Sequence, residues 1–375
     1  MIDIFKKIAK KHYYPLNNIK VSGERLSKNY EHLCSINKKV KVAPVIKGNA
    51  YGHGIVQVAK ILDQKSPPFF CVDSLYEAYL LLKVSIESPI LIMGYVNPLN
   101  LQVKKLPFSY AIYDLNLANA LNKFQPGTQV HIKVDTGMHR LGVLLKDLPD
   151  FLNRLKKLHN IKIVGLMSHL ASVKGTNDKL AMKQIEDFKI AKRILHDADQ
   201  VVQWTHLAST SGLLNVSKKI SELSNVARVG LALYGIDKKS VVLKPVLKLT
   251  SKIIQMKTIK KGEKVGYDGT FTAKEEMLIG ILPIGYSDGV DLRLSNKGKV
   301  LVRNQNCDII GNVSMNITTI SLQTVKKPHV GEQVVIYSDN HNDINSVENA
   351  ARICDTIPYE ILAHLSPTSI RREMV

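Results

Sequence analysis

The feature that most constrains the fold is a regular alternation of short apolar, β-rich runs with amphipathic helical stretches between about residues 41 and 235. Eight such runs occur, at residues 41–47, 69–74, 89–94, 109–114, 129–137, 161–169, 201–209 and 225–235. Parallel strands are covered on both faces and therefore read as near-continuous apolar runs. The pattern predicts an α/β fold, a (β/α)8 barrel, and leaves an open doubly wound sheet as the alternative.

After residue 235 the rhythm changes to β-rich segments without long helices. These segments lie at residues 246–259, 277–286, 299–304, 307–322 and 332–339, with a short helical insert at residues 347–354. A chain of 375 residues is long enough to bury two cores. We expect a barrel at residues 1–240 and a mostly β C-terminal domain at residues 241–375.

The net charge of +20 raises the question of nucleic-acid binding. Most of this charge comes from lysines spread in pairs, such as Lys156–Lys157, with no arginine-rich stripe and few interleaved aromatic residues. Such charges are typical of solvated helix and loop surfaces. We expect no nucleic-acid partner, although a basic surface helps to collect an anionic cofactor or substrate.

The cysteines and the N-terminus indicate the compartment. The four cysteines, Cys34, Cys71, Cys307 and Cys354, show neither metal-ligand spacing nor a disulfide framework. The first residues lack the continuous apolar segment of a secretory signal, and no apolar run reaches the roughly 18 residues of a membrane span. The sequence predicts a cytoplasmic protein with reduced thiols, no metal site and no membrane partner.

Polar residues recur where the predicted barrel strands end. In this fold the C-terminal ends of the strands surround the active site. The residues at these ends are Lys47, Lys133, Arg140, His169, Ser209, Thr210, Arg228 and Gly230. Taken alone, a lysine at a strand end is typically a snorkelling surface group, His169 a hydrogen-bonded core histidine, and Arg228 half of an ordinary ion pair. Together, five separate strand ends favour one site.

Lys47 has a specific chemical capability at this position. An amine among cations, partly removed from water, loses proton affinity and can form a Schiff base. Lys47 could therefore carry pyridoxal 5′-phosphate. The backbone near Gly230 and the hydroxyls of Ser209 and Thr210 offer donors of the kind that bind a phosphate group.

Nine ordered sequence blocks resemble the alanine racemases, which are barrel-type pyridoxal phosphate enzymes. The blocks are VIKGNAYGHG, HIKVDTGMHRLG, GLMSHLAS, HLASTSG, ARVGLALYG, GEKVGYDGTFTA, PIGYSDG, GNVSMN and IPYEIL. The resemblance extends from about Ile19 to Leu365, with the blocks in the order of the family. The resemblance implies a homodimer that interconverts L- and D-alanine and supplies D-alanine for peptidoglycan.

The resemblance also implies roles for individual residues. Lys47 matches the lysine that binds the cofactor and acts as one base, and Tyr267 matches the opposing base. The cofactor's phosphate is implied to lie near Tyr51, Thr210, Gly230 and Tyr359, and its ring nitrogen near Arg228, which His169 supports. On the substrate side, the implied residues are Arg140, Lys133 (often carbamylated), Tyr286 at an inner gate, and Met315. In the family, Tyr267 and Met315 reach the site from the partner subunit.

This arrangement suits racemisation, because inversion at the α-carbon needs a proton removed from one face and returned to the other. The cofactor supplies the electron sink. A phenol with a pKa near 10 is a weak base at neutral pH, so Tyr267 must be tuned by cations such as Arg140 and Lys47. Arg228 stays protonated and leaves the ring nitrogen unprotonated, which should suppress transamination.

Several positions depart from the family pattern. His139 replaces a glycine, Asn316 replaces an aspartate, and Lys174 and Asn312 stand where an acidic residue and an arginine often pair. The usual C-terminal RVPR ending is absent from the sequence. These departures leave both bases in place, and we expect them to affect substrate entry, affinity and the tightness of the dimer.

Three rival functions share parts of this pattern. A broader racemase acting on serine or basic amino acids would need a wider pocket. An amino acid decarboxylase of similar fold would lack the KVDTGM block and the pairing of Lys47 with Tyr267. A non-catalytic pyridoxal phosphate carrier would end with the barrel. The ordered blocks favour alanine racemisation over all three.

Overall fold

The computed structural model describes residues 14–171, 178–236 and 242–375. The chain divides into two compact units. Among the described residues, the barrel unit comprises residues 26–51 and 55–236, and the β-rich unit comprises residues 14–25, 52–54 and 242–375. Thus the N-terminal strand and three residues after Tyr51 cluster with the C-terminal part of the chain.

The barrel unit is built on parallel strands. They are β2 (Lys41–Pro44), β3 (Phe70–Val72), β4 (Ile90–Ile92), β5 (Ser109–Ile112), β6 (Thr128–Asp135), β8 (Ile161–Met167), β9 (Trp204–His206) and β10 (Val226–Val229). Hydrogen bonds connect each of the strands β3, β4, β5, β6, β8 and β9 to the next in chain order, and β10 pairs with β2. A parallel bridge between Val45 and Cys71 joins β2 to β3, and the Arg228 N–H donates to the Ala208 carbonyl beside β9. The ring therefore closes, which confirms the predicted barrel and excludes the doubly wound sheet.

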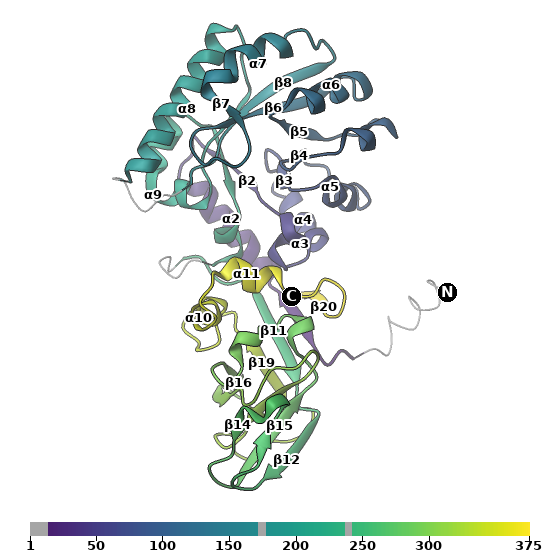
Figure 1. The fold of residues 1–375 in the computed structure, drawn as a ribbon, viewed down its shortest axis with the longest axis vertical. Helices are drawn as coiled ribbons and strands as arrows, with labels where there is room; N and C mark the ends of the chain where they lie inside the picture. The colour runs from purple at the N-terminus through teal and green to yellow at the C-terminus, as the bar shows by residue number, and fades with distance from the viewer. Residues whose placement is uncertain (1–13, 172–177, 237–241) are drawn as a thin grey trace. The chain divides into compact units, whose positions relative to one another are not determined.

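Helices alternate with these strands along the chain (Figure 1). They are α2 (Gly23–Ser35), α3 (Lys47–Tyr51), α4 (Ile55–Asp63), α5 (Leu75–Leu82), α6 (Leu115–Phe124), α7 (Leu148–Leu155), α8 (Lys179–Asp197) and α9 (Thr210–Ser221). The Asp178 carboxylate caps α8 by accepting from the N–H groups of Leu180 and Ala181. The apolar face of this helix is buried at Ala181, Ile185 and Phe188.

The β-rich unit contains a six-stranded and a three-stranded sheet. The larger has the order β17 (Gln305–Asp308), β16 (Lys299–Val302), β19 (Gln333–Tyr337), β11 (Leu247–Lys252), β1 (Asn18–Val21), β20 (Arg371–Met374). The smaller has the order β12 (Gln255–Ile259), β15 (Met277–Leu282), β18 (Thr318–Ser321), and the hairpin β13 (Lys264–Val265) with β14 (Phe271–Thr272) is separate. Two helices accompany them, α10 (Val347–Ile353) and α11 (Pro358–Ala363). The predicted β character of this region is confirmed.

Two long predicted runs are interrupted in the structure. Residues 246–259 form β11 and β12, which belong to different sheets, because the chain changes sheets at Ile253 and Ile254. Residues 307–322 divide into β17 and β18, with Gly311 at a φ of 71° between them. Strands β1 and β20 pair in parallel at the sheet edge. Neither strand was predicted, because each has only four residues and so shows too short a pattern.

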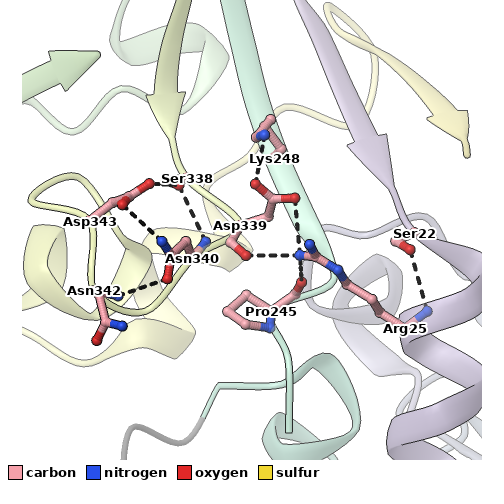
Figure 2. Close-up of polar contacts among 9 residues, drawn as sticks. All are labelled: Ser22, Arg25, Pro245, Lys248, Ser338, Asp339, Asn340, Asn342 and Asp343. Carbon is pink, nitrogen blue, oxygen red and sulfur yellow. Dashed lines mark hydrogen bonds and ion pairs between the residues drawn. The ribbon is translucent and has the colours of Figure 1, made fainter. Parts of the chain in front are cut away.

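A polar cluster ties the first turn of α2 to the large sheet (Figure 2). The Arg25 guanidinium donates to the Asp339 carboxylate at 3.0 Å and to the Pro245 carbonyl at 2.9 Å. Lys248 Nζ lies 2.7 Å from the other Asp339 oxygen. The side chain of Asn340 donates to Asp343 at 3.0 Å and so tightens the loop after β19. These bonds all lie within the β-rich unit.

No helix in the described ranges is long and apolar enough to cross a membrane. The four cysteines are free thiols, as predicted, and three of them, Cys71, Cys307 and Cys354, are buried.

Candidate active site

The C-terminal strand ends of the barrel bring together most of the predicted residues. Lys47 follows β2, Lys133 lies near the end of β6, and His169 follows β8. Thr210 begins α9 after β9, and Arg228 lies in β10. These positions come from five different strands, so the barrel closes them around a common region.

Lys47 lies directly before a left-handed turn. Residues Gly48, Asn49, Ala50 and Tyr51 have φ values of 61°, 54°, 54° and 51°. This conformation costs roughly 1–2 kcal/mol for each residue that has a Cβ, so the turn must be held by its surroundings. The Asn49 side chain accepts from the Ile55 N–H at 2.9 Å, and the Ala50 N–H donates to the Ile46 carbonyl at 2.8 Å. The Lys47 side chain is 42% exposed.

Arg228 is the centre of a buried hydrogen-bond network. Only 4% of the residue is exposed. Nη1 donates to the His206 carbonyl at 2.6 Å and to His206 Nδ1 at 2.8 Å. Nη2 donates to the Ser168 carbonyl at 2.6 Å and to His169 Nδ1 at 3.2 Å. Since a guanidinium can only donate, both imidazoles must accept through Nδ1.

This constraint continues to a third histidine. With its Nδ1 accepting, neutral His206 carries its proton on Nε2 and donates to His131 Nδ1, which lies 2.8 Å away. Burial and the charge of Arg228 lower the pKa of His131 and of His169 to about 3, and lower that of His206 well below its usual value. Burial lowers the pKa of Arg228 to about 10, so it keeps its charge at neutral pH. The histidines are neutral there and the arginine is the cation.

His131 and His206 were not predicted as site residues, because both lie inside predicted strands. The two residues lie on β6 and β9, with β8 between them. Gly165 on β8 leaves the space for their contact, because a Cβ there would lie 2.1 Å from His131 Nδ1. A glycine in the strand between two histidine-bearing barrel strands was the available signal.

Lys133 is a buried amine in a cationic environment. It is 7% exposed. Burial, followed by the charges of Arg228, Arg140 and Lys47, lowers its pKa to about 8, while Asp73 opposes this change. A fraction of the side chain is therefore neutral and nucleophilic under mildly basic conditions.

Arg140 is exposed on the loop that follows β6. Asp135 Oδ1 accepts from the N–H groups of Gly137 at 2.9 Å, Met138 at 2.9 Å and His139 at 3.1 Å. Burial disfavours the charged form of Asp135, but these three bonds lower its pKa overall. The chain then returns to β6 through Gly142, where a Cβ would lie 2.5 Å from the Asp135 nitrogen. Asp135 thus fixes the loop that carries Arg140.

Tyr51, Thr210 and Gly230 form a small cradle of donors. A Cβ on Gly230 would lie 2.6 Å from Tyr51 Oη, so only glycine allows this approach. The Gly230 N–H donates to Thr210 Oγ1 at 3.3 Å. The Tyr51 ring packs against Tyr234 at a centroid distance of 5.3 Å, and Tyr234 donates to the Val45 carbonyl. The hydroxyls and backbone N–H of this cradle suit an anionic group such as a phosphate.

The remaining predicted residues, Tyr267, Tyr286, Met315 and Tyr359, belong to the β-rich unit. Tyr267 is 73% exposed and Met315 56% exposed. The Tyr286 N–H donates to the Ser314 carbonyl next to Met315 at 3.0 Å. Tyr359 lies in α11. Tyr286 and Met315 are thus joined on one surface of this unit.

The structure shows the local surroundings of the departures from the family pattern. His139 has a φ of 52°, a conformation that favours glycine. The Asn316 side chain donates to Ser287 Oγ at 2.7 Å, a bond that an ionised aspartate could not donate. Asn312 donates to the Tyr267 carbonyl at 3.3 Å. Lys174 lies outside the described residues.

Comparisons with known proteins agree with this geometry. The models of the alanine racemase N-terminal and C-terminal domains match residues 21–238 and 246–373. Alanine racemase 1 of Caldanaerobacter subterraneus subsp. tengcongensis is 31% identical over 361 residues, covering 93% of this chain and 92% of that protein. Alanine racemase of Borreliella burgdorferi is 32% identical over 364 residues, covering 92% of this chain and 94% of that protein.

Solved structures extend the similarity to the whole fold. Alanine racemase from Bacillus anthracis with bound L-Ala-P matches with a TM-score of 0.89 at 27% identity, covering 97% of this chain and 96% of that one. Alanine racemase from E. faecalis matches with a TM-score of 0.87 at 27% identity, covering 97% and 99%. This chain belongs to the alanine racemase family.

Proposed function

We propose that this enzyme interconverts L-alanine and D-alanine with pyridoxal 5′-phosphate, by a two-base mechanism at the barrel end that carries Lys47. The observation that carries the proposal is the buried Arg228 network among the same strand ends as Lys47. A charged guanidinium held by four acceptors and surrounded by neutral histidines is a fixed donor for a ligand's ring nitrogen.

The residues present fit this cofactor. Lys47 offers an amine for its aldehyde, and the donors of Tyr51, Thr210 and Gly230 suit its phosphate. When bound, pyridoxal 5′-phosphate supplies a conjugated electron sink that acidifies the α-hydrogen of an amino acid. Arg228 would donate to the ring nitrogen without giving up its proton, which would restrict the sink and favour rapid return of the proton to the α-carbon.

Two bases must face opposite sides of the α-carbon. We assign these roles to Lys47 and to Tyr267, which lies in the other unit and is 73% exposed. Together with Met315, whose backbone amide would hold the substrate carboxylate, Tyr267 would be delivered across the interface of a homodimer. Large exposed apolar side chains such as these are common at interfaces.

Lys133 and Arg140 complete the substrate side in this proposal. The lowered pKa of Lys133, about 8, leaves part of the amine able to add carbon dioxide. A carbamylated Lys133 would pair with Arg140 and hold it beside the cofactor and the substrate carboxylate. His169 would support Arg228, Tyr286 would line the passage to the site, and Tyr359 would contact the phosphate.

The cellular role and domain division complete the proposal. D-alanine would be supplied for peptidoglycan in the cytoplasm. Residues 1–240 would form the cofactor-binding domain, apart from the N-terminal strand and residues 52–54, which cluster with the β-rich unit. Residues 241–375 would carry Tyr267 and the dimer contacts.

A chirality-resolved assay tests the reaction. We expect wild-type protein to convert L-alanine to D-alanine. Tyr267→Phe should lose activity by roughly 10²-fold or more, since a positioned base contributes at least that factor. Tyr14→Phe, at another exposed tyrosine, should retain the wild-type rate. Full activity of Tyr267→Phe would refute the role of this phenol. Borohydride should label the peptide containing Lys47; a colourless, unlabelled protein would refute the cofactor assignment.

Complementation tests the dimer. Lys47→Ala and Tyr267→Phe should each be inactive alone. A mixed dimer of the two variants contains one site with both bases intact, so random reassociation should restore up to about a quarter of the activity. If both bases came from one chain, mixing would restore nothing.

A further inference from the structure

The N-terminus of α5 brings two carboxylates to the segment that carries Lys47. Asp73 follows β3, and Asp73 Oδ1 lies 3.1 Å from Lys47 Nζ. Glu77, in the first turn of α5, accepts from the Gly48 N–H through Oε1 at 2.7 Å. One carboxylate therefore contacts the functional amine, and the other contacts the backbone of the next residue.

The backbone holds Asp73 firmly in place. Its N–H donates to Glu77 Oε2 at 2.9 Å, and its carbonyl accepts from the Gly94 N–H at 2.9 Å. A Cβ on Gly94 would lie 2.3 Å from this carbonyl, so the approach requires glycine. Ser74 and Glu77 also form a complete capping box. The pair itself is partly exposed, at 42% for the Lys47 side chain and 57% for the Asp73 side chain, but the Asp73 backbone is held at both its N–H and its carbonyl.

The Glu77 contact supports a conformation that the chain would otherwise avoid. The left-handed turn begins at Gly48, whose N–H points to Glu77. A hydrogen bond to an ionised carboxylate is stronger than one to a neutral acceptor. Glu77 thus connects the rigid start of α5 to the turn that sets the direction of Lys47.

The charges around Lys47 are mostly positive. Lys47 and Arg228 both lower the pKa of Lys133 and of His169. Both also act on Cys71 in β3, although burial dominates there and raises its pKa to about 12. Arg140 adds to the positive charge that acts on Lys133, whereas Asp73 acts in the opposite direction. Asp73 is the counter-charge that contacts the amine of Lys47 itself.

We propose that Asp73 is a positioning residue for the racemase reaction, which orients the Lys47 amine and stabilises its ammonium form, while Glu77 fixes the turn that presents this amine. The inference rests on the proposed function, because the role of Lys47 is assigned there. Asp73 supplies the counter-charge that contacts the amine, and Glu77 fixes the turn next to Lys47.

Attachment of pyridoxal phosphate to the cofactor-stripped full-length chain tests Asp73 separately from turnover. Attachment joins the unprotonated Nζ to the aldehyde carbon and releases the aldehyde oxygen as water. In Asp73→Asn the amine loses its counter-charge, so attachment should reach half its plateau at a pH lower by roughly 0.5–1 unit. The absorbance of the lysine-bound cofactor reports this midpoint, and borohydride fixation identifies Lys47.

A matched control is Asp150→Asn, which removes another exposed carboxylate, 2.9 Å from Arg154. This variant should keep the wild-type midpoint pH. Asp73→Glu keeps the charge, so its midpoint pH should lie between those of wild type and Asp73→Asn. An unchanged or raised midpoint in a folded Asp73→Asn would overturn the role of Asp73. Failure of wild-type protein to attach the cofactor at Lys47 would instead overturn the proposed function.

Glu77→Gln tests whether Glu77 fixes the turn after Lys47. Glu77 accepts from the N–H groups of Gly48, Asp73 and Ser74, and Gln offers a single carbonyl oxygen for them, so at least one bond is lost. We expect pyridoxal phosphate to bind roughly tenfold more weakly, with the midpoint pH unchanged. Wild-type affinity in this variant would remove Glu77 from the proposal. A shifted midpoint would contradict the division of roles between the two carboxylates.

Discussion

Two regions of the barrel mouth hold an arginine in different surroundings, one buried and one exposed. On one side, Arg228 is buried and held by the backbone carbonyls of Ser168 and His206. On the other, the Arg140 loop is exposed and held through the single carboxylate of Asp135. The first region is rigid because its donors have no alternative partner in water. The second depends on one titratable group and on a strained backbone, so it should respond to pH and to small substitutions.

The buried side should show the largest effect when it is broken. Arg228→Lys replaces a planar fork with a point charge and cannot satisfy the acceptors on His206, Ser168 and His169 together. We expect the free energy of unfolding to fall by roughly 3 kcal/mol, because buried polar groups lose their partners. Urea denaturation measures this change. Arg154→Lys, in an exposed pair with Asp150, should change it by less than about 0.5 kcal/mol.

The buried histidines should make stability depend on pH. The folded-state pKa of His131 is about 3, below the value near 6.5 of an unfolded histidine. Between these values the unfolded chain binds more protons, so stability falls as the pH decreases through this window. His131→Gln does not titrate and can still accept from His206. The free energy of unfolding of this variant should therefore decrease less with falling pH than that of wild type, with slopes that differ by up to about 1.36 kcal/mol per pH unit. Identical slopes between pH 6 and 4 would show that His131 is not kept neutral.

The exposed side is tested by Asp135→Asn. The variant keeps one acceptor oxygen but loses the charge that strengthens three hydrogen bonds, so we expect a loss of about 1–2 kcal/mol at pH 7. The folded-state pKa of Asp135 is lowered, so its contribution is present above the unfolded value of 3.8 and is lost as the pH falls below it. The free energies of unfolding of wild type and variant should therefore converge at acidic pH. If Arg140 has its proposed role, KM for alanine should also rise more than kcat falls.

The two regions also differ in how far the sequence predicted them. Lys47 and Arg228 were predicted because strand ends in a barrel converge, and this convergence follows from the alternation of strands and helices. His131 and His206 were missed because their contact crosses β8 and requires the missing side chain of Gly165. Asp73 and Glu77 were missed because a capping box explains Glu77 locally, whereas its bond to Gly48 depends on how α5 meets the turn. Local patterns therefore predicted the barrel and its strand ends, but not these contacts between elements.

The smallest effect should come from His139, where the exposed loop departs from the family. His139 has a φ of 52° and a mostly exposed side chain, whose Nδ1 lies 4.0 Å from Asp135 Oδ2. Glycine adopts this backbone conformation without the steric cost of a Cβ. His139→Gly should therefore raise the free energy of unfolding by about 0.5–1 kcal/mol, which urea denaturation measures. His139→Ala keeps the strain and should bring no gain. An equal gain in His139→Ala would show that the removed imidazole, and not the left-handed backbone, is the source of the difference.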